Sequence, residues 1–510
     1  MNRSALRLIA LATLLFGAAA IALGRVLNLS VDESYTLYTT SGSLLDAIQR
    51  ALHFEMQAPA YFALDWFWRR LDSDPVFGRV LSTLLVCTAG VVLGILGNRR
   101  IGGIWGPAMT FAVLLNPLAW WSAEEMRVYA LVIALTSVLV FSFFEGFALE
   151  DNAWAQVGFG LAAAAGLYTQ YYVAFFLVAG GATLLIFRRW RLLKRYALIV
   201  ALAGIAFLPM VAVIPSQMAA AARDFRSAAP FPLDMSVDLR GIAVLFAPFA
   251  WLRGGGALAA VFSLATASLA FWPRPGVAVA GSLLVARIAW SLTAVAAAVF
   301  VLAQTAAHEP NNYKYFSLFV APALVALMAT FASLTSLSGK IRAANLAVAM
   351  ASVVFLLDLV ALEHAYSRLA KIGDWKRVAT FLQPRVAAGQ PILVFEADNA
   401  LPLSYHYRGY GTIVPLPHQV DFQSYSLHDI ALRGEEELDA ALLATHSTSP
   451  VVWLVTADYC VFENGLDFHC GVIESWVHRR FTVANTTHFY GSTVRELHRA
   501  HVVVGAREQR

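Results

Sequence analysis

The sequence predicts a polytopic, all-α membrane domain of about 11 to 13 transmembrane helices, followed by a small C-terminal α/β domain. Composition predicts the first part, since 59% of the 510 residues are hydrophobic, only 14% are charged, and the mean hydropathy is +0.63. Soluble enzymes are more polar than this. Charged residues, proline and glycine reappear after residue 362 and predict the second part. We therefore expect two domains, residues 1–362 and 363–510.

Eleven apolar stretches each approach the roughly 20 residues that a helix needs to cross a bilayer. The first, Ala5 to Leu23, looks like a signal peptide, but no clear small-residue cleavage site separates it from Asp32, so we interpret it as a retained span. The others are expected at 76–97, 104–121, 128–148, 153–169, 171–187, 196–214, 257–272, 280–304, 315–334 and 343–362. The segment from Val237 to Leu252 is ambiguous, because an interfacial helix and two short re-entrant segments both fit it.

Basic residues predict the orientation of the spans. They cluster on the side of the N-terminus, at Arg99, Arg100, the run 188–195, Arg274, Lys340 and Arg342. The positive-inside rule places this side in the cytoplasm, so an odd number of spans leaves the C-terminal domain outside the cytoplasmic (inner) membrane. The net charge of +4 is explained by these loops, and nucleic acid is not an expected partner.

The outer loop 25–75 carries Asp32 and Glu33 directly after the first span. Two carboxylates at a membrane surface are costly and by default mark chemistry or ion handling. A carboxylate there can accept a proton from an incoming hydroxyl or amine. The alternative is that one of the pair caps a helix that starts near Ser34 while the other is solvated. The same loop predicts two helices that lie flat on the interface, Leu44 to Leu52 and Ala58 to Trp68, the second being too short to span.

Two further groups of polar residues belong to the outer face. Glu55 precedes a helix N-terminus, so a favourable electrostatic position and a substrate-binding role fit it equally. Arg127 lies at headgroup level, where a guanidinium can bind phosphate oxygens through two parallel hydrogen bonds. A local salt bridge from Arg127 to Glu124 or Glu125 is the alternative, and both can hold at once.

Two later outer segments add aromatic and basic residues. Tyr171 and Tyr172 lie at an interface, which by itself is an ordinary aromatic belt. Lys314 and Tyr315 open a span, so the Lys314 ammonium can reach phosphate level. Snorkelling of Lys314 to the interface is the alternative.

The last 148 residues read as a small α/β domain on the outer face. Its apolar β-type runs lie at 391–395 and 451–455, and its helical patterns lie at 375–382 and 435–443. Cys460 and Cys470 both belong to it. In an oxidising compartment the two could be bridged, and two free thiols are the alternative.

An ordered set of motifs runs along nearly the whole chain. It comprises the Asp32-Glu33 pair, the stretch Glu55 to Phe62, Arg79, the pattern Glu125-x-Arg127-x-Tyr129-x-Leu131, the turn Tyr168 to Tyr172, a tyrosine-rich start leading to Pro322-Ala323-Leu324, and Asp374-Trp375-Lys376. Together these resemble the GT-C superfamily of membrane glycosyltransferases, in the family 39 and protein O-mannosyltransferase-like branch, which also contains the aminoarabinose and galacturonic acid transferases of lipid A. No single motif is decisive.

The resemblance implies a transferase that uses a polyprenyl-phosphate sugar at the outer membrane face. It implies that Asp32 is the base or positions the acceptor, with Glu33 supporting, and that Arg127 and Lys314 hold the lipid phosphate. The remaining candidate substrate-binding residues are Glu55, Glu125, Tyr129, Tyr171, Tyr172 and Tyr315. The chain departs from the family's usual pattern at Ala58-Pro59, where relatives usually show paired prolines, at Gln170, where His is common, and at Lys314, where Arg is frequent.

The expected partners are the polyprenyl-phosphate sugar donor, a lipid, glycan or protein acceptor, and membrane lipids. No metal-ligand set is evident in the sequence, and dependence on a divalent metal stays open. One alternative function is a lipid-linked sugar transporter or flippase, although such proteins commonly show internal repeats and none is found here. The other is a non-catalytic cell-envelope scaffold, which would leave Asp32 and Arg127 without a purpose.

Overall fold

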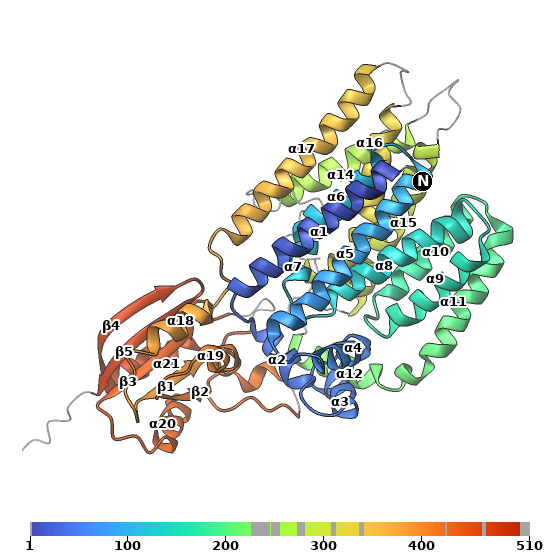
Figure 1. Ribbon diagram of the computed structural model, residues 1–510. Coiled ribbons are helices and arrows are strands. Elements are labelled where there is room, and N and C mark those ends of the chain that lie inside the picture. The colour runs from blue at the N-terminus through green and yellow to red at the C-terminus, as the bar shows by residue number, and fades with distance from the viewer. Residues whose placement is uncertain are drawn as a thin grey trace, which may run out of the picture. The chain divides into compact units, whose positions relative to one another are not determined.

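The structure is a computed structural model of the chain, and it describes residues 3–225, 245, 255–272, 281–307, 313–335, 341–423, 426–461 and 466–499 (Figure 1). The chain packs as two compact units. The first comprises Met1–Arg25 and Thr36–Arg368, and the second comprises Val26–Tyr35 and Leu369–Arg510. The short segment that carries Asp32 and Glu33 thus packs with the C-terminal part of the chain. The ambiguous segment Val237 to Leu252 lies outside the described residues, apart from Leu245.

The first unit is helical, and its apolar helices match the expected spans. Among the residues that the structure describes, seven helices are long and apolar enough to cross a membrane, and four more apolar helices are shorter. In chain order the eleven are α1 (Arg3–Val26), α5 (Pro75–Arg100), α6 (Trp105–Leu115), α8 (Tyr129–Phe143), α9 (Ala153–Leu167), α10 (Val173–Ile186), α11 (Trp190–Val211), α14 (Gly255–Phe271), α15 (Gly281–Ala307), α16 (Val320–Thr335) and α17 (Ile341–Tyr366). A π-helical turn, Phe144–Ala148, continues α8, and a 3-10 turn, Tyr313–Phe319, precedes α16. The prediction of a multi-pass, all-α membrane domain is confirmed.

One expected span is interrupted. The stretch 104–121 forms α6 and then a separate short helix, α7 (Pro117–Ala123). The side chain of Asn116 accepts hydrogen bonds from the backbone N–H groups of Leu118 and Ala119, so it caps a new helix. Pro117 occupies the first position of that helix, where its missing N–H is not needed. This break sets the course of the chain before the loop that carries Arg127.

Besides α7, the described residues before α14 include the short helices α2 (Val31–Thr39), α3 (Leu44–His53), α4 (Ala60–Arg69) and α12 (Ile214–Phe225). Both stretches predicted to be helical in loop 25–75 are helical, as α3 and α4, and their position at the membrane interface stays a prediction. Ser43 and Asp46 begin α3 with reciprocal side-chain bonds to each other's backbone N–H, which is a capping box. Helix α2 begins at Val31, so both carboxylates of the Asp32-Glu33 pair lie in its first turn, where the helix dipole favours negative charge.

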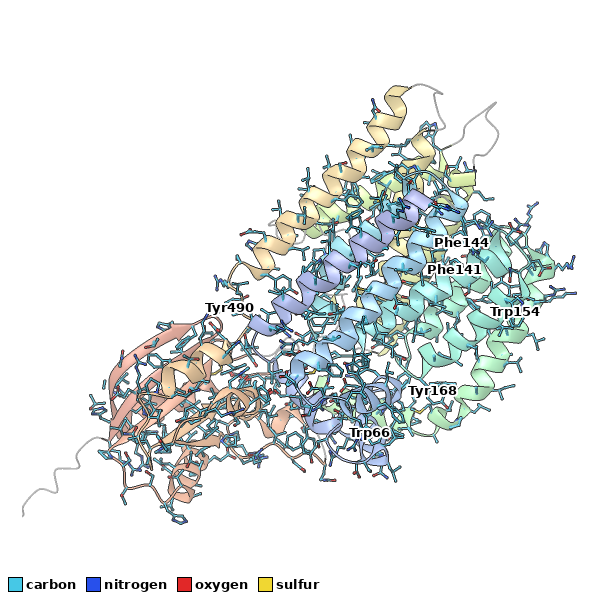
Figure 2. The ribbon with its side chains drawn as sticks, viewed as in Figure 1. Trp66, Phe141, Phe144, Trp154, Tyr168 and Tyr490 are labelled. Atoms are coloured by element: carbon cyan, nitrogen blue, oxygen red, sulfur yellow. A yellow bond between two sulfur atoms is a disulfide. The ribbon has the colours of Figure 1, made fainter. Side chains whose placement is uncertain are left out.

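The first unit has an apolar core, and many of its exposed side chains are apolar as well. Helices α5, α6, α8 and α16 pack against one another, and α16 is buried over its whole length. Other helices present large apolar side chains outward, as Trp154 on α9 does with 85% of its surface exposed (Figure 2). An apolar outer surface is what lipid-facing helices require.

The second unit is built on a five-stranded sheet with strand order β2-β1-β3-β5-β4. The strands are β1 (Pro391–Phe395), β2 (Thr412–Pro415), β3 (Val451–Ala457), β4 (Phe481–Phe489) and β5 (Ser492–Arg499). Strand β1 pairs in parallel with β2 and β3, and Val394 lies opposite Val455. All five residues of β1 are buried, as expected for a central parallel strand.

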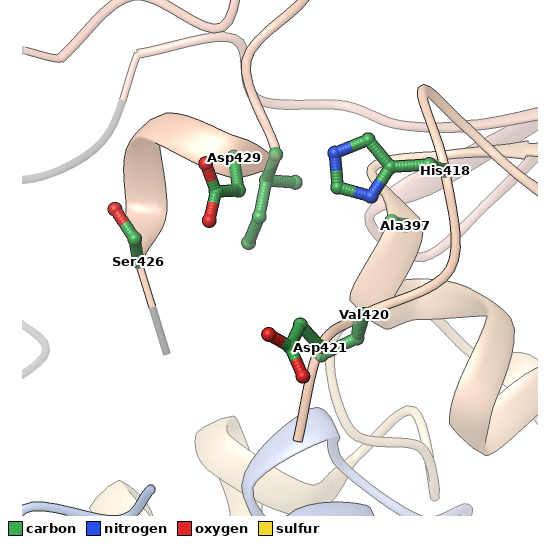
Figure 3. A pocket seen from close by; sticks show the side chains of 7 residues that line it. Ala397, His418, Val420, Asp421, Ser426 and Asp429 are labelled. Atoms are coloured by element: carbon green, nitrogen blue, oxygen red, sulfur yellow. The ribbon is translucent and has the colours of Figure 1, made fainter. Parts of the chain in front are cut away.

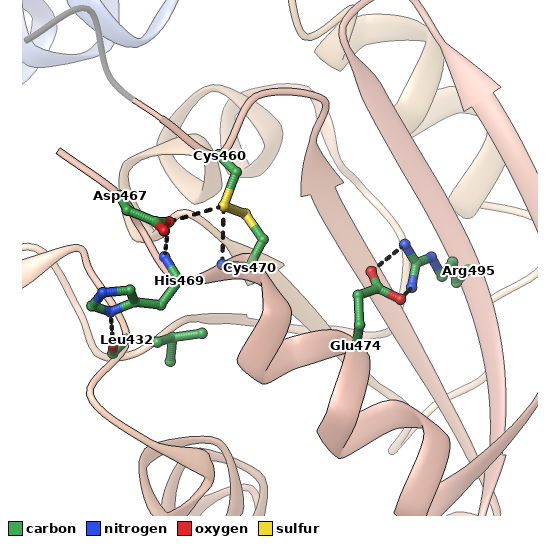
Figure 4. Close-up of a disulfide and its surroundings, with 7 residues drawn as sticks. All are labelled: Leu432, Cys460, Asp467, His469, Cys470, Glu474 and Arg495. Atoms are coloured by element: carbon green, nitrogen blue, oxygen red, sulfur yellow. Dashed lines mark hydrogen bonds and ion pairs between the residues drawn. A yellow bond between two sulfur atoms is a disulfide. The ribbon is translucent and has the colours of Figure 1, made fainter. Parts of the chain in front are cut away.

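Helices cover this sheet and complete its core. They are α18 (Trp375–Leu382), α19 (Ala400–His406), α20 (Glu435–Ala444) and α21 (Cys470–Arg480). Trp375, Val378 and Leu382 recur at helical spacing on α18 and pack against Ile392 of β1. The prediction of a small C-terminal α/β domain is confirmed. Cys460 and Cys470 form a disulfide at the start of α21 (Figure 4).

Candidate functional site

A buried ion pair joins two loops of the first unit. Arg127 lies between α7 and α8, and Glu55 lies between α3 and α4. Arg127 Nη1 donates to Glu55 Oε2 at 2.7 Å, and the two side chains are only 6% and 3% exposed. Such a pair is stable only when further hydrogen bonds hold it. The partner Glu55 comes from 72 residues away in the sequence. An additional local salt bridge from Arg127 to Glu124 or Glu125 stays a prediction.

Two threonines of α2 supply those further hydrogen bonds. Arg127 Nη1 also donates to Thr36 Oγ1 at 3.2 Å, and Thr39 Oγ1 donates to Glu55 Oε1 at 3.0 Å. Thr36 and Thr39 lie one turn apart, so both face the ion pair. The guanidinium and the carboxylate are therefore held in a fixed orientation. Sequence analysis missed both threonines, because hydroxyl residues in a short helix carry no distinctive pattern.

Aromatic rings extend from this ion pair. Tyr129, which follows Arg127 by two residues, packs against Tyr61 and Phe62 of α4. Its ring lies 5.2 Å from that of Trp121, and Lys314 Nζ lies 5.6 Å from the Trp121 ring centre. A cation over an indole face is electrostatically favoured. Lys314 is thus connected to the Arg127 loop through two aromatic rings.

The predicted tyrosines Tyr172, Tyr315 and Tyr171 have separate surroundings. Tyr172 and Tyr315 contact each other, with ring centres 5.0 Å apart. Tyr171 instead donates to Gln217 Oε1 at 2.7 Å, and Gln217 Nε2 donates to the carbonyl of Leu52 at 2.8 Å. Gln217 of α12 therefore joins Tyr171 to the end of α3.

Glu125 is buried beside a tightly packed contact. Ser82 Oγ of α5 donates to the backbone carbonyl of Glu125 at 2.7 Å. Arg79 Nη1, on the same helix, donates to the carbonyl of Gly24 at 2.5 Å. A Cβ atom at Gly24 would lie 2.9 Å from Glu124 Oε2, so a larger residue there would require the Glu124 side chain to shift.

In the second unit, Glu33 is completely buried, and Lys371 and Ser30 are among its partners. Lys371 Nζ lies 2.8 Å from Glu33 Oε2, and the backbone N–H and the hydroxyl of Ser30 donate to the same oxygen at 3.0 and 3.4 Å. The backbone N–H of Lys371 donates to Asn28 Oδ1 at 2.8 Å, which adds a second link between the segments. This geometry is that of a structural anchor for residues 26–35.

Asp32, in the same turn of α2, belongs to a cluster of acids and tyrosines. Tyr35 Oη donates to Asp398 Oδ2 at 3.3 Å. Burial raises the pKa of Asp398 to about 6, the bond from Tyr35 opposes this shift, and the nearby Asp32 carboxylate adds to it. Burial and Asp398 likewise raise the pKa of Glu396 to about 9. Burial also raises the pKa of Tyr459, which forms a hydrogen bond with Glu396.

Lys371, Glu396 and Asp398 were not predicted from the sequence. The position of Glu396 and Asp398 after a buried strand is a signal that could have identified them. Glu396 and Asp398 directly follow the buried strand β1, and Tyr459 follows the parallel strand β3. Polar residues at the carboxyl ends of neighbouring parallel strands meet at one edge of the sheet, where α/β domains place their sites. Lys371 carried no such signal.

A shallow pocket lies next to this edge of the sheet. It is lined by Ala397, His418, Val420, Asp421, Ser426, Asp429 and Ile430 (Figure 3). Its lining includes none of the residues predicted from the sequence. Across the described part of the chain, no group of three or more His, Cys, Asp or Glu residues is arranged to hold a metal ion.

No family model matches the sequence, and no curated protein matches it. Solved structures are similar in fold. ArnT from Cupriavidus metallidurans in the apo state is 15% identical, with 95% of this chain and 97% of that chain covered and a TM-score of 0.49.

Two further solved structures are similar over most of the chain. The same ArnT bound to undecaprenyl phosphate is 13% identical, covers 95% of this chain and 97% of its own, and has a TM-score of 0.43. The Archaeoglobus fulgidus oligosaccharyltransferase in complex with Zn and sulfate is 9% identical, and its TM-score is 0.44. The match covers 87% of this chain and 68% of the oligosaccharyltransferase chain. Similarities of this size concern the path of the chain and assign no substrate.

Removal of the Lys371 cation is expected to destabilise the second unit. In Lys371→Met the Glu33 carboxylate stays buried without its ion-pair partner, which costs about 3–5 kcal/mol in comparable sites. Faster hydrogen exchange at β1 and β3, measured by mass spectrometry on the full chain, would report this loss. Lys371→Met/Glu33→Gln should recover most of the protection, and Lys194→Met, at an exposed position of α11 in the first unit, serves as the matched control. Wild-type exchange in the single variant would contradict this account.

Proposed function

We propose that the protein is a membrane glycosyltransferase. It moves a sugar from a polyprenyl-phosphate donor to a lipid, glycan or protein acceptor at the outer face of the cytoplasmic membrane. The observation that carries this proposal is the buried Arg127–Glu55 pair, since it fixes a guanidinium in a loop between membrane helices. Arginine in a fixed orientation suits a phosphate, whose oxygens accept parallel hydrogen bonds.

Donor binding is assigned to the first unit. Arg127 binds the lipid phosphate through its guanidinium, and Lys314 adds a second positive charge. Glu55 orients Arg127, and Glu125 supports the same loop from within. Aromatic rings are common partners of sugar and isoprenoid surfaces because they are apolar with a polar edge. Tyr129, Tyr171, Tyr172 and Tyr315 are the candidate rings.

The transfer step is assigned to Asp32, with Glu33 supporting it from the same helical turn. The acceptor hydroxyl gives its proton to the Asp32 carboxylate while the acceptor oxygen forms a bond to the anomeric carbon. The bond between the anomeric carbon and the phosphate oxygen breaks, and its electron pair leaves with polyprenyl phosphate. Positive charge from Arg127 and Lys314 stabilises that leaving group. Direct attack of this kind inverts the anomeric centre.

The experiment is a transfer assay on the full chain in lipid nanodiscs. Undecaprenyl-phosphate sugars are offered one at a time together with a membrane lipid and glycan extract, and mass spectrometry follows both products. We expect undecaprenyl phosphate to be released in equal amount to an acceptor that is heavier by one sugar residue. In proteoliposomes, movement of intact donor across the bilayer without phosphate release would contradict the proposal and identify a transporter. If no donor is bound or turned over, the proposal is contradicted and the protein is a non-catalytic scaffold.

A further inference from the structure

The acidic residue Asp398 has the properties of a working part of the Asp32 site. It follows β1 directly, in a 3-10 turn, and only 7% of its surface is exposed. Its Oδ1 atom makes no hydrogen bond to the described residues, and its Oδ2 atom accepts the hydrogen bond from Tyr35. A buried carboxyl group without a cation bonded to it is costly, so its presence calls for an explanation.

Tyr35 ties this residue to the helix that carries Asp32. Asp32 and Tyr35 are three residues apart on α2, so they lie on one face of the helix. The bond from Tyr35 to Asp398 therefore fixes the rotation of the first turn of α2 relative to the sheet of the second unit. The Asp32 carboxylate also raises the pKa of Asp398, although less than burial does.

We propose that Asp398 is a positioning residue for the transfer reaction, which holds the first turn of α2 through Tyr35 and strengthens Asp32 as a base by its negative charge. This inference rests on the proposed function, because it takes Asp32 to be the base. A carboxylate beside a second carboxylate binds a proton more tightly, since like charges disfavour the ionised form. A base with higher proton affinity accepts the acceptor's proton more readily.

The groups around Asp398 define when it carries its charge. Asp32 and Tyr35 face it from α2, Glu396 lies two residues before it, and Tyr459 approaches from the end of β3. The pKa of Asp398 is about 6. Below that pH Asp398 is protonated and adds no charge, and above it Asp398 is ionised and assists Asp32. The transfer rate is thus expected to rise as the pH increases through about 6.

The test is the pH profile of kcat/KM for the full chain in nanodiscs, with the donor and acceptor found in the transfer assay. In Asp398→Asn we expect the ionisation near pH 6 to disappear from the profile and the plateau to fall about three- to tenfold. The KM for the donor should stay unchanged, because Arg127 and Lys314 are intact. A purely structural role would lower the amount of folded protein and leave the shape of the profile as it is.

A second variant shifts the ionisation of Asp398 instead of removing it, so the inference can be tested even if Asp398→Asn does not fold. Tyr35→Phe removes the hydrogen bond that lowers the pKa of Asp398 and leaves every charge in place. The acid limb of the profile should then move to higher pH. The control is Glu474→Gln, which makes the same change from acid to amide. Glu474 lies on α21 and pairs with Arg495 of β5 at the surface (Figure 4). The Glu474→Gln protein should reproduce the wild-type profile.

Three outcomes separate the proposals. Loss of the ionisation in Asp398→Asn together with its upward shift in Tyr35→Phe supports the inference. Wild-type profiles in both variants would overturn it, while an inactive Asp32→Asn protein would still leave the proposed function in place. Full activity of Asp32→Asn would overturn the proposed function itself, and this inference with it.

Discussion

Replacement of Arg127 by Met is expected to weaken the binding of undecaprenyl phosphate by about 10- to 100-fold. In the proposed function Arg127 makes charge-assisted hydrogen bonds to the phosphate, which contribute about 1.5–3 kcal/mol each, and the variant loses them. The same change leaves Glu55 buried without the cation 2.7 Å away, and this costs about 3–5 kcal/mol of stability. Binding of radiolabelled undecaprenyl phosphate and thermal unfolding in detergent measure the two effects on one preparation.

A double variant separates the two roles of Arg127. Arg127→Met/Glu55→Gln removes both charges, so most of the lost stability should return while phosphate binding stays weak. Arg127→Lys keeps the charge and loses the forked geometry, and it should bind with intermediate affinity. The matched control is Arg191→Met, since Arg191 is exposed and lies 3.6 Å from Asp151. If the double variant bound undecaprenyl phosphate as tightly as the wild type, Arg127 would serve only to pair with Glu55.

Most of the fold could be predicted from the sequence because membrane spans and central strands are local features. A span needs only a long apolar run, and each of the eleven expected runs is helical. Strand β1 is a continuous apolar run, and α18 repeats its apolar residues at helical spacing. The break of one span at Asn116 was also encoded locally, in an Asn-Pro pair that favours the start of a new helix.

The candidate site could be predicted only in part, because its contacts join segments that are far apart in the chain. Asp32, Glu33 and Arg127 were found as polar residues in unexpected surroundings. Their partners were not, since the Glu33–Lys371 pair spans 338 residues and the Tyr35–Asp398 bond spans 363. No local periodicity reports such pairs. Only for Glu396 and Asp398 does a general rule give a signal, because polar residues at the carboxyl ends of parallel strands such as β1 often form the site of an α/β domain.

The central claim of this account is that Asp32 supplies the base for glycosyl transfer. Its most direct test is Asp32→Asn in the nanodisc transfer assay, because the amide keeps the shape of the side chain and cannot take the acceptor's proton. Undecaprenyl phosphate binding is measured on the same protein. The account predicts wild-type binding, which depends on Arg127 and Lys314, together with transfer that is slower by about 100- to 10,000-fold. Transfer at the wild-type rate by the Asp32→Asn protein would contradict the account.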